Sequence, residues 1–130
     1  MEVATHHAIV RRLSGEPVEL EVGRAVVRQE TNGDMVADAQ GLIHGGFIFA
    51  AADYAAMLAV NDPNVVLGSA EVRFEAPVRV QQVVVYEARV VSSEGTKHRV
   101  EVEGRVDHKT VFRGTFTCFV LDRYVLDQAE

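Results

Sequence analysis

Asp53 is the only charged residue between Gly45 and Asn61, within the longest apolar stretch of the chain. Removing a lone carboxylate from water costs several kcal/mol unless the group is hydrogen-bonded or paired. The residue type alone leaves two interpretations. Asp53 either meets a structural partner, such as a backbone donor, a tyrosine or an arginine, or it takes part in a reaction.

The residues in front of Asp53 supply a second chemical group. His44, Gly45 and Gly46 stand where a helix is expected to begin. Glycines there let a ligand approach the free N–H groups of the first turn, where the helix dipole favours negative charge. Gly46 and Asp53 are seven residues apart, so both project from one helix face. Thioester hydrolysis needs both parts, because N–H donors hold the developing oxyanion while a carboxylate acts on water or on the carbonyl carbon.

The element that carries Asp53 is predicted to be a buried helix over residues 46–60. This segment is rich in alanine and has almost no polar face, so it must be covered on nearly every side. Pro63 follows closely and ends the helix, because the residue before a proline is pushed out of helical geometry.

Strands are predicted on both sides of this helix. After it, apolar and polar residues alternate over residues 69–78, 83–91, 97–107 and 111–121, with short turns at 92–95 and 107–109. These four strands predict an antiparallel meander. Before the helix, a valine-rich strand over residues 18–30, a hairpin turn at 31–34 and a short strand at 35–37 are expected. The helix is the element that can fill the concave face of the sheet, which predicts an α+β fold in a single domain over residues 1–130.

The composition limits the possible functions. The net charge of -6 argues against a general nucleic-acid surface, although a local group of arginines could still bind a polyanionic small ligand. Cys118 is the single cysteine and is expected to pack as a small apolar group. The N-terminus lacks a secretory signal, and the apolar stretch is too interrupted to span a membrane, so a cytoplasmic location is expected. The five histidines form no second cluster, and we expect no metal.

Two motifs resemble a known family. Residues 41–47, with Asp53 nine positions after His44, resemble the signature of hotdog thioesterases of the phenylacetyl-CoA type. Residues 69–78 resemble that family's central strand and its terminal proline. The resemblance covers about residues 18–121.

This resemblance implies a hotdog fold and an acyl-CoA thioesterase that needs no cofactor. Asp53 would be the general base or nucleophile, and the backbone amide of Gly46 would polarise the thioester carbonyl. His44 would mainly shape the loop, although a direct acid or base role stays open. The site would lie at a subunit interface of a homodimer or homotetramer. The candidate substrate-binding residues are Gly45, Phe47 and Ser69.

The chain departs from this family at Asp38. Many relatives have an asparagine six residues before the histidine, where this sequence has a second carboxylate. Asp38 is therefore a further candidate catalytic residue, and it could share a proton with Asp53 if the two approach each other.

Two other functions stay open. Residues 111–116 also resemble the effector-binding domain of bacterial regulators that sense malonyl-CoA, which favours a non-catalytic acyl-CoA sensor. The stretch before residue 18 is expected to be too short for the DNA-binding helix-turn-helix of those regulators. A hydratase or dehydratase on the same fold would use a catalytic histidine in a different loop context.

Overall fold

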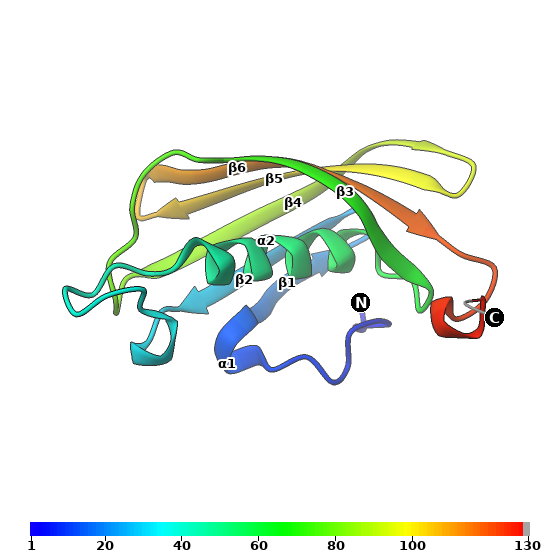
Figure 1. The fold of residues 1–130 in the computed structure, drawn as a ribbon. Helices are drawn as coiled ribbons and strands as arrows, with labels where there is room; N and C mark the ends of the chain where they lie inside the picture. The colour runs from blue at the N-terminus through cyan, green and yellow to red at the C-terminus, as the bar shows by residue number, and fades with distance from the viewer. Residues whose placement is uncertain (129–130) are drawn as a thin grey trace.

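The computed structural model describes residues 1–128, and within them one long helix lies along the concave face of a six-stranded antiparallel sheet (Figure 1). The order across the sheet is β1-β2-β4-β5-β6-β3. The strands are β1 (Glu16–Glu21), β2 (Arg24–Glu30), β3 (Val65–Phe74), β4 (Val83–Glu94), β5 (Lys97–Val106) and β6 (Lys109–Val120). The helices are α1 (Arg11–Ser14), η1 (Gly33–Met35), the long α2 (Gly45–Val60) and η2 (Val125–Gln128). This arrangement confirms the predicted α+β class and the hotdog fold.

Helix α2 begins and ends where the sequence signals predict. His44 caps its start, and Asn61 ends it in the left-handed conformation, two residues before Pro63. The buried side chains are mostly small, so the sheet packs closely around the helix. They are Ile48, Ala51, Ala52, Tyr54, Ala55, Ala56, Met57, Leu58 and Ala59.

The alternating pattern identifies the inner face of most strands correctly. On β5, Val100 and Val102 are buried, and on β6, Phe116 and Cys118 are fully buried. On β3, however, Ala70 and Phe74 are exposed although both were expected on the inner face. Strand β3 lies at the edge of the sheet and pairs only with β6 among the described residues, so no neighbouring strand covers its other side.

The prediction for the segment before α2 was wrong in two places. Residues 18–30 contain parts of two strands, β1 and β2, which turn at Gly23 (φ 77°) instead of forming one strand. The run 31–34 leads into η1 instead of closing a hairpin, because the Asn32 side chain accepts a hydrogen bond from the backbone of Asp34. Residues 35–37 consequently form no strand, and only a single bridge joins Val36 to Ile43.

The predicted meander was right for β4, β5 and β6 but wrong for β3. Strand β3 pairs with β6 on the far edge, while β4 is flanked by β2 and β5. Alternation sets which face of a strand is buried, and it carries no information on which strands are neighbours. The chain therefore crosses from one edge of the sheet toward its middle between residues 75 and 82.

Candidate active site

Asp53 lies near the middle of α2 and is half-buried. Its Oδ1 atom is buried and accepts no hydrogen bond from any side chain or amide of residues 1–128. Burial raises the pKa of this carboxyl from its ordinary 3.8 to about 6. The structural partner that would explain a buried acid is thus missing from the described part of the chain, which leaves a chemical role as the better interpretation.

Cys118 on β6 lies close to Asp53. Burial, together with the negative charge of Asp53, raises the pKa of the Cys118 thiol to about 12. The thiol therefore stays protonated, and its full burial confirms the expected packing role. Asp53 accordingly faces a neutral, apolar neighbour from the sheet.

The start of α2 presents two backbone amides with different surroundings. The Gly46 N–H donates to Nδ1 of His44 over 2.8 Å. The Gly45 N–H makes no hydrogen bond to another backbone group of the described chain. His44 therefore caps the helix, which agrees with its expected role in shaping this loop. The Gly46 amide becomes free for a ligand only when the imidazole turns away.

Gly45 and Gly46 also leave little room for a side chain in the present arrangement. A Cβ atom at Gly45 would lie 3.3 Å from the ring of Phe74, and one at Gly46 would lie 2.8 Å from Nδ1 of His44. Phe74 is 53% exposed and meets Phe112 edge-on, with 5.5 Å between ring centroids. The sequence prediction missed Phe74, because nothing in the alternating pattern of β3 shows that its ring crosses over the helix start.

Asp38 has a structural use in the loop before α2. Its Oδ1 atom accepts hydrogen bonds from the backbone N–H groups of Gln40 (2.9 Å) and Leu42 (3.2 Å). The raised pKa of Asp53 is caused by burial alone, without a contribution from Asp38. Within one chain the Asp53 carboxyl therefore titrates without Asp38, and proton sharing between the two carboxyls stays a prediction.

The two remaining predicted residues, Phe47 and Ser69, lie on different elements. Phe47 lies in the first turn of α2, with its ring edge-on to His44 at 6.2 Å. Ser69 lies on β3 opposite Thr117 of β6 and is exposed. The structure thus gathers His44, Gly45, Gly46 and Phe47 at one helix end, two turns before Asp53.

A buried polar network that the sequence did not reveal holds the first turn of α2. The Gln29 side chain donates from Nε2 to the carbonyls of Leu13 and Phe47, each over 2.9 Å. Its Oε1 accepts from the hydroxyl of Tyr86 over 2.7 Å. Gln29 is completely buried, and every polar atom of its side chain is used. This amide fixes the position of the helix start relative to the sheet.

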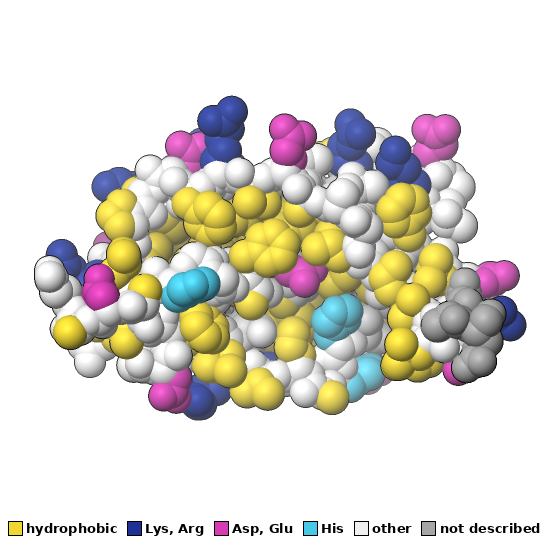
Figure 2. All heavy atoms as spheres, in the orientation of Figure 1, with side chains coloured by type: hydrophobic (Ala, Val, Ile, Leu, Met, Phe, Trp, Pro, Cys, Tyr) yellow, Lys and Arg dark blue, Asp and Glu magenta, His cyan; other side chains and the backbone are white. Residues whose placement is uncertain are grey.

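The face of the molecule that carries α2 is largely apolar. Figure 2 shows hydrophobic side chains across this face, with an acidic side chain and histidines among them. The exposed apolar residues at the helix start and the β3 edge are Val36, Leu42 and Phe74. Together with the unpaired edge of β3, they form a surface that the single chain leaves uncovered.

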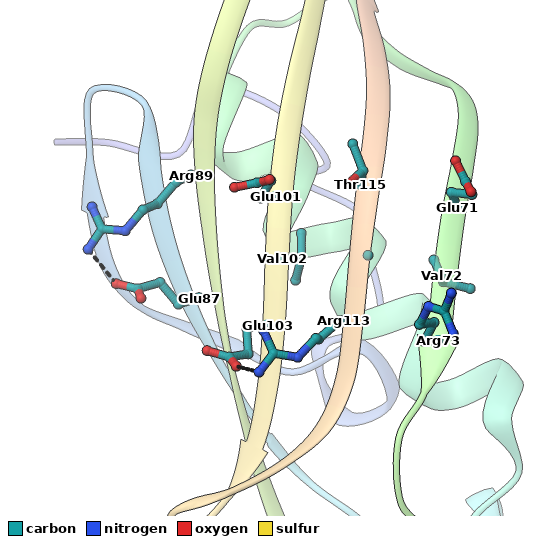
Figure 3. A pocket seen from close by; sticks show the side chains of 11 residues that line it. Glu71, Val72, Arg73, Glu87, Arg89, Glu101, Val102, Glu103, Arg113 and Thr115 are labelled. Atoms are coloured by element: carbon teal, nitrogen blue, oxygen red, sulfur yellow. Dashed lines mark hydrogen bonds and ion pairs between the residues drawn. The ribbon is translucent and has the colours of Figure 1, made fainter.

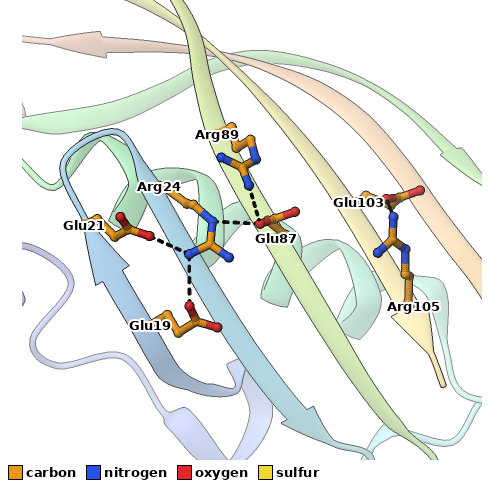
Figure 4. A network of polar contacts seen from close by, with 7 residues as sticks. All are labelled: Glu19, Glu21, Arg24, Glu87, Arg89, Glu103 and Arg105. Atoms are coloured by element: carbon orange, nitrogen blue, oxygen red, sulfur yellow. Dashed lines mark hydrogen bonds and ion pairs between the residues drawn. The ribbon is translucent and has the colours of Figure 1, made fainter. Parts of the chain in front are cut away.

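The opposite face of the sheet is charged. A shallow hollow of about 730 Å³ on this face is lined by pairs such as Glu87 with Arg89 (2.9 Å) and Glu103 with Arg113 (3.1 Å), shown in Figure 3. Arg24 bridges three glutamates nearby, and Glu103 also pairs with Arg105 (Figure 4). Arg105 and Arg113 thus have their charges paired on the face of the sheet opposite α2, the helix that carries Asp53.

Two features are absent from residues 1–128. None of the helices there is long and apolar enough to cross a membrane. No group of three or more histidine, cysteine or acidic side chains in this part of the chain could hold a metal ion.

Comparison with known proteins identifies the family. Residues 40–112 match the model of the thioesterase superfamily. The chain belongs to this superfamily. Its structure is similar to the crystal structure of an uncharacterized protein from Pyrococcus horikoshii, with 47% identity, a TM-score of 0.96 and 98% of each chain covered. It is also similar to a mutant of the phenylacetic acid degradation protein PaaI from Thermus thermophilus, with 32% identity, a TM-score of 0.77, and 84% of this chain and 95% of that chain covered.

Two curated relatives, an isomerase and a transcription factor, are longer than this chain. A methylthioribose-1-phosphate isomerase from Aquifex aeolicus is 48% identical over 125 residues, which cover 95% of this chain and 27% of the isomerase. The transcription factor FapR from Caldanaerobacter subterraneus subsp. tengcongensis is 32% identical over 109 residues, which cover 83% of this chain and 54% of FapR. The chain thus spans about a quarter of the first relative and about half of the second.

Proposed function

We propose that this protein hydrolyses acyl-CoA thioesters with Asp53 as its catalytic carboxylate. The observation that carries the proposal is the buried Oδ1 atom, which has no partner in the described chain and belongs to a carboxyl group with a pKa raised to about 6. Such a group is ionised at neutral pH and is a stronger base than an ordinary aspartate. Membership of the thioesterase superfamily supports the same reaction.

The reaction follows from two groups, the Asp53 carboxylate of one subunit and the helix-start amides of another. Asp53 takes a proton from water, whose oxygen bonds to the thioester carbonyl carbon while the C=O electron pair moves to oxygen. Collapse of this intermediate breaks the C–S bond, and the leaving sulfur receives the electron pair and a proton. Direct attack by Asp53 on the carbonyl carbon, followed by hydrolysis of the anhydride, is the alternative route. Neither route needs a metal or an organic cofactor.

The helix start supplies the oxyanion site in this proposal. The Gly45 N–H has no backbone partner, and the Gly46 N–H exchanges His44 Nδ1 for the substrate carbonyl. His44 is exposed, so its imidazole has room to turn. Two amides aimed at one oxygen stabilise the developing negative charge more than the neutral carbonyl, which is the requirement for catalysis.

A second copy of the chain completes the site. The edge of β3 is unpaired and the apolar surface formed by Val36, Leu42 and Phe74 is uncovered in the single chain. Pairing of two β3 edges would continue the sheet across both subunits and cover this surface. We infer a homodimer or homotetramer in which the carboxylate of one subunit meets the helix-start loop of the other.

The acyl group is expected to be apolar. Phe49 lies one helical turn before Asp53 and packs on Phe116 of β6, with 5.6 Å between ring centroids. A charged acyl group would lose its hydration against such rings without gaining a partner. Phe47 and Ser69 stay candidate contacts for the substrate.

Steady-state assays against a panel of acyl-CoAs test the proposal. We expect hydrolysis by the wild-type protein and a fall in kcat of roughly 100-fold or more in Asp53→Asn and Asp53→Ala, because both lose the base. Asp107→Asn makes the same chemical change in the exposed turn between β5 and β6 and should keep wild-type activity. Full activity in Asp53→Asn would contradict the proposal.

A non-catalytic acyl-CoA sensor is the second candidate, and the similarity to the transcription factor FapR favours it. Calorimetric titration with a non-hydrolysable acyl-CoA analogue, combined with the assays above, separates the two functions. Tight binding without turnover of any thioester in the panel would support the sensor.

A further inference from the structure

The N-terminal segment brings a second histidine to α2. The half-buried ring of His6 lies against Tyr54, with centroids 6.2 Å apart and ring planes tilted by 34°. Tyr54 directly follows Asp53 in the helix. Figure 1 shows the N-terminal segment running beside α2, and Figure 2 shows a histidine side chain next to the acidic side chain of the apolar face.

The backbone holds His6 in a conformation that needs support. Its φ of 56° lies in the left-handed region, which is unfavourable for a residue with a Cβ atom and persists only where neighbouring contacts enforce it. Those contacts are present. The Ala4 N–H donates to Oδ1 of Asn61 over 2.8 Å, the Asn61 amide donates to the Glu2 carbonyl over 2.9 Å, and Thr5 is almost completely buried.

The two ring nitrogens of His6 differ in their surroundings. Nδ1 lies 2.8 Å from the hydroxyl oxygen of Thr5, while Nε2 makes no hydrogen bond or ion pair with another residue of 1–128. Burial lowers the pKa of His6, which favours the neutral imidazole. When the Nδ1–H donates to Thr5, Nε2 is left with a free lone pair that accepts a hydrogen bond.

We propose that His6 is a positioning residue of the thioesterase site, whose Nε2 accepts one O–H of the water that Asp53 deprotonates. The inference rests on the proposed hydrolysis. His6 keeps its own proton throughout: one water proton passes to Asp53, the water oxygen bonds to the carbonyl carbon, and the second O–H stays on His6 Nε2. The water is thereby held between two acceptors with a lone pair directed at the substrate.

This role makes the acid side of the pH profile depend on two groups. The titratable or charged groups around His6 include Asp53 and Tyr54 of α2 and the adjacent His7. Arg11 of α1 and Glu16 of β1 belong to the same surroundings, because both act on the Tyr54 hydroxyl. As the pH falls, Asp53 gains a proton and stops acting as a base. His6 gains one on Nε2 and stops accepting a hydrogen bond from water.

The positions of the two groups can be tested without any enzyme assay. In an NMR titration, replacing Asp53 by asparagine removes a negative charge that favours the protonated imidazole, so the titration of His6 should move to lower pH. His108, in the exposed β5–β6 turn, is the internal reference and should not move. An unchanged titration of His6 in Asp53→Asn would overturn the inference.

Two variants of His6 then separate catalysis from packing. His6→Phe keeps a ring against Tyr54 without any nitrogen, and we expect kcat to fall about tenfold, the effect of one ordinary hydrogen bond, with KM and Tm close to wild type. His6→Gln restores a hydrogen-bond acceptor that does not titrate. It should recover most of kcat and reduce the acid limb of the kcat profile from two protons to one.

The possible failures are distinguishable. Wild-type kcat in His6→Phe, while Asp53→Asn is inactive, would overturn the role of His6 and leave the proposed function standing. Equal losses of kcat and Tm in both His6 variants would show a packing role instead. Absence of thioester hydrolysis by the wild-type protein would overturn the proposed function together with this inference.

Discussion

Replacing Asp53 by asparagine should stabilise the folded protein at neutral pH. The two side chains have nearly the same shape, but asparagine carries no charge that must be buried in the apolar surroundings of α2. The pKa of Asp53 is about 6 in the folded chain, against an ordinary 3.8. This difference of about two units corresponds to about 3 kcal/mol, an upper value because the side chain is only half-buried.

The pH dependence gives the sign of this effect. Well below pH 3.8 the carboxyl is protonated in both states, so it costs nothing on folding. As the pH rises from about 4 to about 6, the unfolded chain ionises before the folded one, and the stability of the wild-type protein falls. Above about pH 6 the loss is complete. The advantage of Asp53→Asn over wild type should therefore grow across this window and then stay constant.

Urea unfolding at fixed protein concentration, repeated between pH 4 and pH 8, measures this difference. Asp107→Asn is the matched control, since it removes a carboxylate from an exposed turn. We expect the difference between Asp53→Asn and wild type to increase by up to about 3 kcal/mol, and the difference for Asp107→Asn to stay nearly flat. A flat difference for Asp53→Asn would refute the reasoning, because it would mean that the folded carboxyl titrates normally.

Two more predictions concern the parts of the chain that support the site. Gln29→Leu should lower the free energy of unfolding by about 2–5 kcal/mol in a denaturant titration, since the carbonyls of Leu13 and Phe47 and the hydroxyl of Tyr86 all lose a buried partner; a loss below about 1 kcal/mol would show that the network matters little. Phe74→Glu should leave the circular dichroism spectrum unchanged and shift the protein to a monomer in sedimentation velocity with loss of hydrolysis, because it places a charge on the uncovered apolar surface; an unchanged oligomer would exclude this surface as the interface.

The sequence identifies much of the fold because its strongest signals are local. The alanine-rich run predicts α2 to within one residue of its start, and alternation predicts the inner faces of β5 and β6. The turn at Gly23 was missed because the valine pattern continues across it. The place of β3 was missed because pairing joins residues far apart in the chain.

In the candidate site, too, local features could be predicted from the sequence and contacts between distant segments could not. A solitary acid in an apolar helix is visible in the sequence, and so is the glycine pair before it. The hydrogen bond between Gly46 and His44 depends on a side-chain rotation, and Gln29 reaches the helix from another element. His6 lies 47 positions before Asp53 and comes close to α2 only through the path of the N-terminal segment.

The dependence of kcat on pH tests the role of Asp53 most directly. With an acyl-CoA substrate saturating, activity should fall on the acid side with an apparent midpoint near pH 6, so that roughly a tenth of the Asp53 carboxyls are ionised at pH 5. In Asp53→Asn, the small residual activity should lose the Asp53 proton from this limb and keep only the single proton of His6. Hydrolysis that stays constant from pH 7 down to pH 5, or an Asp53→Asn variant with the wild-type profile, would contradict a buried aspartate as the base.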